Sequence, residues 1–216
     1  LQMGASTAKA YNSMYLLTPE QAEAYSQGDI HIHDFDFYAL TETCCQIDLV
    51  KLFHGGFSTG HGFLREPQSI ASYAALAAIA IQANQNDQHG GQGIPNFDYA
   101  LAEGVAKSFA RTYTRKLREA LEDYFDTDDE SELTEKAIAE AGKPGLGDVK
   151  ETFDGIVADE LAKSGRIDRE KAGRLVSRSR QRAEKQVDRD TYQAMEGFIH
   201  NLNTMHSRAG AQTPFS

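Results

Sequence analysis

A long apolar stripe constrains the fold of this chain more than any other feature. Between residues 99 and 125, apolar side chains recur in steps of four. This spacing places them in one line along an α-helix. They are Leu101, Val105, Phe109, Tyr113, Leu117, Leu121 and Phe125. The pattern therefore predicts a long amphipathic helix with one buried face.

Two further helices are predicted before this one. Thr18 is a good N-cap, Pro19 suits the first helical position, Gln21 completes a capping box, and Gly28 ends the short helix. A longer helix is predicted from Pro67 or Ser69 to about Asn86. Its small residues permit close helix packing, and they are Ala74, Ala75, Ala77, Ala78 and Ala80.

Extended and turn segments separate these helices. Residues 29–38 alternate polar and apolar side chains, which predicts an extended segment, and the apolar run 44–50 predicts a buried strand. The glycines of 55–62 predict a loop, and those of 90–93 predict a second turn.

The last third of the chain changes character. Residues 126–189 are dense in charge, and we predict a solvent-facing helical insertion with a turn at 142–147. A final helix is predicted over about 190–205, stopped by Gly210, with a strand beginning at 211–216. Its expected buried residues are Tyr192, Met195, Phe198, Ile199 and Leu202.

Charge and composition exclude several classes of protein. The net charge of -10 argues against binding a nucleic acid polymer, because such binding requires a basic face. No apolar run approaches the ~20 residues of a membrane span, and no signal pattern is present, so a cytoplasmic location is expected. The two cysteines are adjacent, which excludes a disulfide scaffold.

Six segments form a recognisable set, in this order along the chain: 28–34 (GDIHIHD), 44–49 (CCQIDL), 56–60 (GFSTG), 86–92 (NDQHGGQ), 201–206 (NLNTMH) and 210–215 (GAQTPF). Together they resemble the anaerobic, glycyl-radical (class III) ribonucleoside-triphosphate reductases. The resemblance covers about residues 11–126 and 190–216, and the insertion lies outside it.

The resemblance implies that the chain is the N-terminal part of a ten-stranded α/β barrel domain. The fragment itself is expected to be mainly α with few strands. Two strands cannot close a barrel, which supports the interpretation that the chain is a piece of this domain. We divide it into 1–126 with the first strand and long helices, 127–189 as the insertion, and 190–216 with the second strand. Both ends suggest a piece of a longer protein.

Cys44 takes the place of the family's first-strand cysteine, which precedes Ile-Asp-Leu by two variable residues. In the family this thiol helps to reduce the ribose 2′ carbon after a finger-loop thiyl radical abstracts the 3′ hydrogen. Neighbouring residues of a strand face opposite sides, so Cys44 is the predicted catalytic thiol and Cys45 is predicted to be structural. Without the flanking motifs, both would be small buried hydrophobic residues.

Candidate substrate contacts flank the two predicted strands: His33, Asp34, His206 and Arg208. His31, His33 and Asp34 are metal-ligand types, but no third or fourth ligand site lies nearby, so no metal is predicted. The alternatives are hydrogen bonds at the strand entry for the histidines, and capping of a helix C-terminus for the cations near 206–208.

The family also pairs two long helices across a homodimer interface, where a deoxynucleotide or ATP effector binds. Carried over, these helices are 69–86 and 99–125, and a solvated helix face is the alternative. The candidate effector contacts are Gln82, Gln85, Arg115 and Lys116.

The remaining machinery of the family is expected outside these residues: the glycyl radical, the finger-loop cysteine, a zinc site and an ATP cone. Formate or a thiol protein would supply electrons, a radical-SAM enzyme would activate the protein, and this fragment alone would be inactive. Two other functions stay open. One is a formate-lyase-type glycyl-radical enzyme, which also uses adjacent cysteines, and the other is a nucleotide-binding dimerisation module without catalysis.

Overall fold

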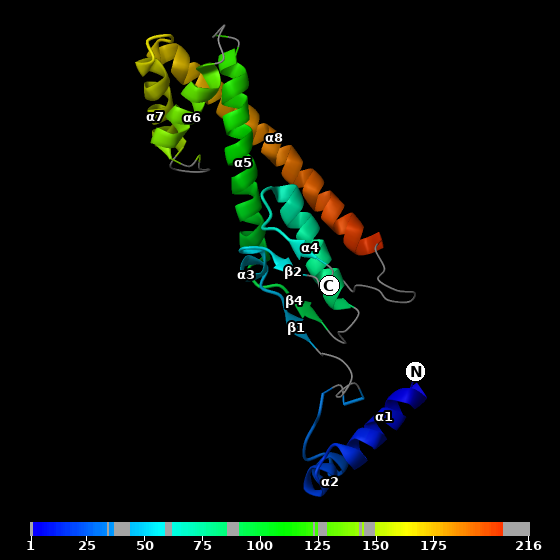
Figure 1. The fold of residues 1–216 in the computed structure, drawn as a ribbon. Helices are drawn as coiled ribbons and strands as arrows, with labels where there is room; N and C mark the ends of the chain where they lie inside the picture. The colour runs from blue at the N-terminus through cyan, green and yellow to red at the C-terminus, as the bar shows by residue number, and fades with distance from the viewer. Residues whose placement is uncertain are drawn as a thin grey trace. The chain divides into compact units, whose positions relative to one another are not determined.

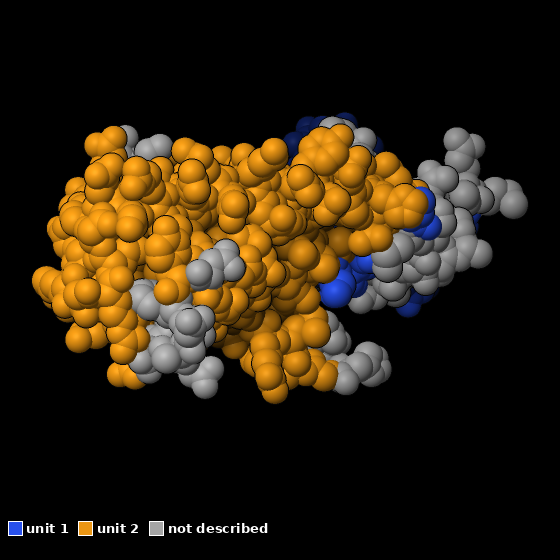
Figure 2. All heavy atoms as spheres, turned by 90° about the horizontal axis from the view of Figure 1, so that it is seen from above, with its two compact units in different colours: residues 1–48, 79–95, 204–216 blue, residues 49–78, 96–203 orange. Residues whose placement is uncertain are grey.

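The computed structural model describes residues 2–33, 35–36, 44–58, 62–85, 91–122, 124, 129–142, 144 and 150–204. Two compact units can be separated, and Figure 2 colours them differently. The first contains the described residues of 1–48 and 79–95 with Thr204, and the second those of 49–78 and 96–203. Helices predominate (Figure 1), as the sequence predicted. Among the described helices, none is long and apolar enough to cross a membrane.

The helices and strands are divided between the two units. The first unit holds α1 (Gln2–Tyr15), α2 (Pro19–Gln27), β1 (Cys45–Gln46) and β4 (Gln92–Gly93). Helix α4 (Ile70–Gln85) starts in the second unit and ends in the first. The second unit also holds α3 (Leu49–Phe53), β2 (Phe57–Ser58), β3 (Phe63–Leu64), α5 (Phe97–Glu122), α6 (Asp129–Ala141), α7 (Lys150–Lys163) and α8 (Arg169–Thr204).

Helix α2 forms with the caps that its sequence predicts. The Thr18 side chain accepts a hydrogen bond from the Gln21 amide, and the Gln21 side chain accepts one from the Thr18 amide. Gly28 ends the helix with φ of 84°, in the left-handed region that glycine adopts without strain. Both predicted ends of this helix are confirmed.

The strand predictions need correction. The run 44–50 forms a strand only at Cys45–Gln46, and α3 begins already at Leu49. Residues 92–93, predicted as part of a turn, form β4, which pairs with β1 in parallel. In the described part of 29–36 there is no strand, and residues 211–216 lie outside the described residues. The barrel expected from the family resemblance therefore stays a prediction.

The second unit is organised around the stripe on α5. Five of the seven predicted positions are buried, Val105 packs against the same core, and Phe125 lies outside the described residues. Helix α8 crosses α5 at an angle (Figure 1). The two helices run in opposite directions, because Phe97 meets Phe198 while Ser179 bonds to the Lys116 carbonyl. The buried α5 residues are Leu101, Phe109, Tyr113, Leu117 and Leu121.

The charged segment 126–189 is helical as predicted, but it is not simply solvent-facing. Its apolar residues pack with the α5 stripe in one core, among them Phe153, Val157, Leu161, Val176 and Val187. The last helix also begins earlier than predicted, because α8 runs unbroken from Arg169. Tyr192 and Ile199 face outward, at 67% and 47% exposure, whereas Phe198 and Leu202 are buried as expected.

A charge is buried inside this core. Arg180 donates to both carboxylate oxygens of Asp154, at 2.7 and 2.8 Å. Its guanidinium also lies over the rings of Phe109, Tyr113 and Phe153, at 5.1 to 6.0 Å. A guanidinium can be buried in this way because a bidentate carboxylate compensates its charge and aromatic faces cover its plane.

Helices α4 and α5 approach closely at a glycine. A Cβ at Gly104 would lie 2.8 Å from ring atoms of Tyr73, so only glycine fits there. The Ser108 hydroxyl accepts a hydrogen bond of 2.8 Å from the Ile70 amide, which satisfies one of the free amides at the start of α4. Most of the predicted alanines of α4 are buried, and only Ala75 is exposed.

Replacing Asp154 should destabilise the second unit strongly. Asp154→Ala removes the bidentate partner of the buried Arg180 charge and leaves the more distant Glu184, at 3.9 Å. We expect a loss of about 3 kcal/mol or more in the free energy of unfolding. Glu170→Ala, which removes the exposed pair with Arg174, is the control and should cost less than ~1 kcal/mol. Denaturant unfolding of both variants measures the difference, and equal losses would contradict the structural role of the pair.

Candidate functional site

The two thiols have different surroundings at the start of β1. Cys44 is exposed and immediately precedes the strand, whereas Cys45 is half-buried within it. The Asn84 side-chain amide donates to the Cys45 sulfur at 3.6 Å. Backbone bonds hold this segment on β4, with the Cys45 amide 3.2 Å from the Gly91 oxygen and the Ile47 amide 2.8 Å from the Gly93 oxygen. Cys44 is thus exposed, and the backbone that follows it is held by hydrogen bonds to β4.

Of the four predicted substrate contacts, the structure describes only His33. His33 is exposed, and its ring lies 6.3 Å from that of His31. Asp34, His206 and Arg208 lie outside the described residues. Within the described part of the chain, no group of three or more His, Cys, Asp or Glu side chains is placed to hold a metal.

The predicted effector contacts lie on α4 and α5 in different settings. Gln82 is half-buried on α4, and the side chain of Gln85 lies outside the described residues. Arg115 is exposed and reaches Glu119 at 3.8 Å, whereas Lys116 binds the same carboxylate more closely, at 2.7 Å. Of the three predicted contacts whose side chains are described, only Arg115 lines an open groove beside α5.

An open groove of about 960 Å³ follows one side of α5. Alanines and Pro144 form its apolar part, and most of its polar side chains are cationic. Arg115 and Arg118 have exposed partners in Glu119 and Glu135, while Arg111 has no ion-pair partner among the described residues. The polar lining consists of Gln68, Glu103, Lys107, Arg111, Thr114, Arg115 and Arg118. Such a lining suits an anionic ligand with an apolar portion.

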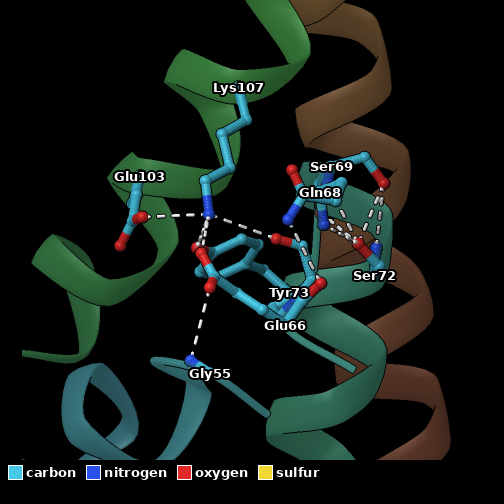
Figure 3. A network of polar contacts seen from close by, with 9 residues as sticks. Gly55, Glu66, Gln68, Ser69, Ser72, Tyr73, Glu103 and Lys107 are labelled. Atoms are coloured by element: carbon cyan, nitrogen blue, oxygen red, sulfur yellow. Dashed lines mark hydrogen bonds and ion pairs between the residues drawn. The ribbon is translucent and has the colours of Figure 1, made fainter. Parts of the chain in front are cut away.

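Figure 3 shows a polar cluster around Lys107. Lys107 and Glu103 of this cluster also line the groove. The ammonium donates to Glu66 at 2.6 Å, to the Tyr73 hydroxyl at 2.9 Å and to the Pro67 carbonyl at 3.3 Å. It also pairs with Glu103 at 3.0 Å. Burial lowers the pKa of Lys107, but its bonds to Glu66, Tyr73 and Glu103 outweigh that effect and raise it. Lys107 is therefore firmly protonated.

Glu66 connects this cluster to the β2–β3 hairpin. Its second carboxylate oxygen accepts a hydrogen bond of 3.3 Å from the Gly55 amide. The hydrogen bond from Lys107, followed by that from Gly55, lowers the pKa of the Glu66 carboxyl. Gly56 has φ of 83°, and a Cβ there would collide with the Leu64 carbonyl, so the hairpin entry requires glycine.

Sequence reasoning missed Lys107, Glu66 and Arg111. The spacing did carry a signal for two of them. Glu103 and Lys107 have the i,i+4 spacing of a helical ion pair, and Arg111 lies on the same helix face as Arg115. Glu66 lies 41 residues before Lys107, so only the packing of α5 brings it there.

Comparison with known proteins gives one consistent family. A family model described as anaerobic ribonucleoside-triphosphate reductase matches residues 1–216. Curated proteins of that name are similar to this chain. The Salmonella typhimurium protein is 33% identical over 104 residues, covering 47% of this chain and 15% of its own length. The Escherichia coli protein is 30% identical over 135 residues, covering 62% of this chain and 18% of its own length. The Enterobacteria phage T4 protein is 33% identical over 91 residues, covering 41% of this chain and 15% of its own length. The matched part thus spans less than a fifth of each relative.

The Glu66–Lys107 bond should make stability depend on pH in a defined direction. Because the pKa of Glu66 is lowered below its usual 4.5, its contribution is present above that value and is lost as the pH falls through the lowered pKa. We expect Glu66→Gln to lower the melting temperature near pH 7, with the difference from wild type vanishing in acid. In a Lys107→Met background, Glu66→Gln should lose most of this effect. A pH-independent difference would contradict the assignment.

Proposed function

Because the chain belongs to the anaerobic ribonucleoside-triphosphate reductase family, we propose that it is a catalytic piece of an enzyme that reduces ribonucleoside triphosphates to deoxyribonucleoside triphosphates. The observation that carries this proposal is the family match over residues 1–216, within which the predicted thiol, Cys44, is exposed immediately before β1. The glycyl radical and the reductant, formate or a thiol protein, belong to the reaction of the complete enzyme. The location is cytoplasmic in this proposal, and an activating enzyme supplies the radical.

Cys44 is the reducing thiol in this proposal. Its exposure supports the role, because a thiol that gives a hydrogen atom to the substrate, or forms a disulfide with another cysteine, must be reachable. The Cys45 sulfur instead accepts a hydrogen bond from Asn84, which suits a structural position. His33, Asp34, His206 and Arg208 remain candidates for holding the substrate around this thiol.

Substituting each cysteine in turn tests the assignment. In the complete, activated enzyme, Cys44→Ser should abolish deoxynucleotide formation while effector binding is retained, because a hydroxyl does not replace the thiol as a reductant. Cys45→Ser is the matched control and should keep most of the activity. Product formation from a ribonucleoside triphosphate is the measurement. If Cys45→Ser is the inactive variant instead, the register of the strand is wrong by one residue.

The formate-lyase-type alternative uses adjacent cysteines as well, but the segment Gln46-Ile47-Asp48-Leu49 argues against it. Turnover of an acyl substrate instead of a ribonucleotide would favour that alternative. A dimerisation module without catalysis is the other candidate. It predicts nucleotide binding with no turnover even in the complete, activated protein.

The groove on α5 is our candidate for the effector site. Its mixture of apolar wall and cations fits a nucleotide, whose triphosphate would meet Arg111 and Arg115. Gln82, Gln85 and Lys116 stay candidate contacts on the same two helices, and in this proposal a second subunit of a homodimer completes the site.

Removing the groove cations tests the effector site. We expect Arg111→Ala to weaken dATP binding about tenfold, because one charge-assisted contact to phosphate is lost, and the Arg111→Ala/Arg115→Ala double variant to weaken it further. Arg65→Ala removes an exposed cation outside the groove and serves as the control. Calorimetric titration of the complete protein measures binding. Unchanged affinity in the double variant would move the effector site elsewhere.

A further inference from the structure

The outer face of α8 carries a continuous row of cations. Lys171, Arg174, Arg178, Arg182, Lys185 and Arg189 follow one another at intervals of three or four residues, and all six are exposed. At 100° per residue, this spacing confines them to roughly 80° of the helix circumference and about 27 Å of its length. We call these six residues the α8 basic face.

The opposite side of the helix fixes this orientation. Ala172, Val176, Ala183 and Val187 are buried in the core with α5 and α7, and Arg180 is held there by Asp154. A rotation of α8 that hid the basic face would expose this core. The cations are therefore presented outward by packing.

Most of this charge is not neutralised by neighbouring side chains. Lys171 pairs with Asp168 at 3.4 Å and Arg174 with Glu170 at 3.1 Å. For the other four cations, the described residues supply no carboxylate within ion-pair distance: Arg178, Arg182, Lys185 and Arg189. The pKa of Glu119 is lowered mainly by its hydrogen bond from Lys116, and the more distant charge of Arg182 adds to this effect. The whole chain has 32 acidic and 22 basic residues, so this row concentrates cations on an acidic protein.

We propose that the α8 basic face, continued by Tyr192 and Ile199, is a docking surface for an acidic helical segment of a partner protein. Carboxylates spaced at i, i+4 and i+7 on such a helix would match the row of cations along α8. Tyr192 is 67% exposed one turn beyond Arg189, and Ile199 is 47% exposed further along. Arginine and tyrosine are, with tryptophan, the residues enriched at the energetic hot spots of protein interfaces.

Other polyanions fit this surface less well. A single-stranded nucleic acid would need aromatic side chains on which its bases could stack, and none interrupts the six cations. An anionic membrane would require apolar side chains among the cations to enter the lipid, and the face has none between Lys171 and Arg189. The proposal is independent of the thiol and of the groove on α5.

The test uses the complete protein and a labelled helical peptide of about 20 residues with glutamates at i, i+4 and i+7. Fluorescence anisotropy compares wild type, Arg182→Glu/Lys185→Glu, and the control Arg65→Glu/Lys136→Glu, which makes the same change in net charge at exposed sites away from α8. Thermal melting checks that each variant folds. A DNA duplex of similar length and a glutamine version of the peptide are the competing probes.

We expect saturable binding of the acidic peptide that weakens about tenfold or more in Arg182→Glu/Lys185→Glu and much less in the control. High salt should weaken it as well, because exposed charges are screened. Equal loss in both variants, no saturable binding, or equal binding of the glutamine peptide would overturn the proposal. Tighter binding of the duplex, lost in the same variant, would identify a nucleic acid surface instead.

Discussion

Burial of the apolar stripe on α5 is the interaction on which the rest of the second unit depends. The helix must cover five large side chains, and α6, α7 and α8 together supply the partners of four of them, from Phe109 to Leu121. Burying this much apolar surface fixes the rotation of α5 about its axis. The directions of its other side chains are therefore fixed too. Arg111 and Arg115 line the groove, and Lys107, one helical turn before Arg111, reaches Glu66.

The same packing explains how a charge-dense segment becomes part of a core. The many charged residues of 126–189 suggested a solvated insertion, yet α7 and α8 carry apolar residues at helical spacing that are buried in one core with α5. Arg180 is a charged exception. Its guanidinium can be buried because Asp154 and three aromatic rings take the place of the water that would otherwise solvate it. The outward cations of α8 are a consequence of this arrangement, since the inner face is occupied.

At the thiols the controlling interaction is backbone pairing. A two-residue parallel ladder with β4 fixes the segment that carries Cys45, and it leaves Cys44 just before the strand and exposed. Both strands are short, and one of them contains glycine, so their residue preferences carry little signal. The family resemblance directed attention to Cys44, and the structure adds the different surroundings of its neighbour.

The sequence by itself determined the local features: the caps of α2, the amphipathic face of α5, the helical nature of 126–189 and the small residues of α4. These follow from interactions within a few residues, which spacing and residue type reveal. Only the tertiary structure decided the strand at 92–93, the burial of Arg180, the outward turn of Tyr192 and Ile199, and the meeting of Glu66 with Lys107. Each of these depends on contacts between residues far apart in the chain, and no local pattern records which distant surface a side chain will meet.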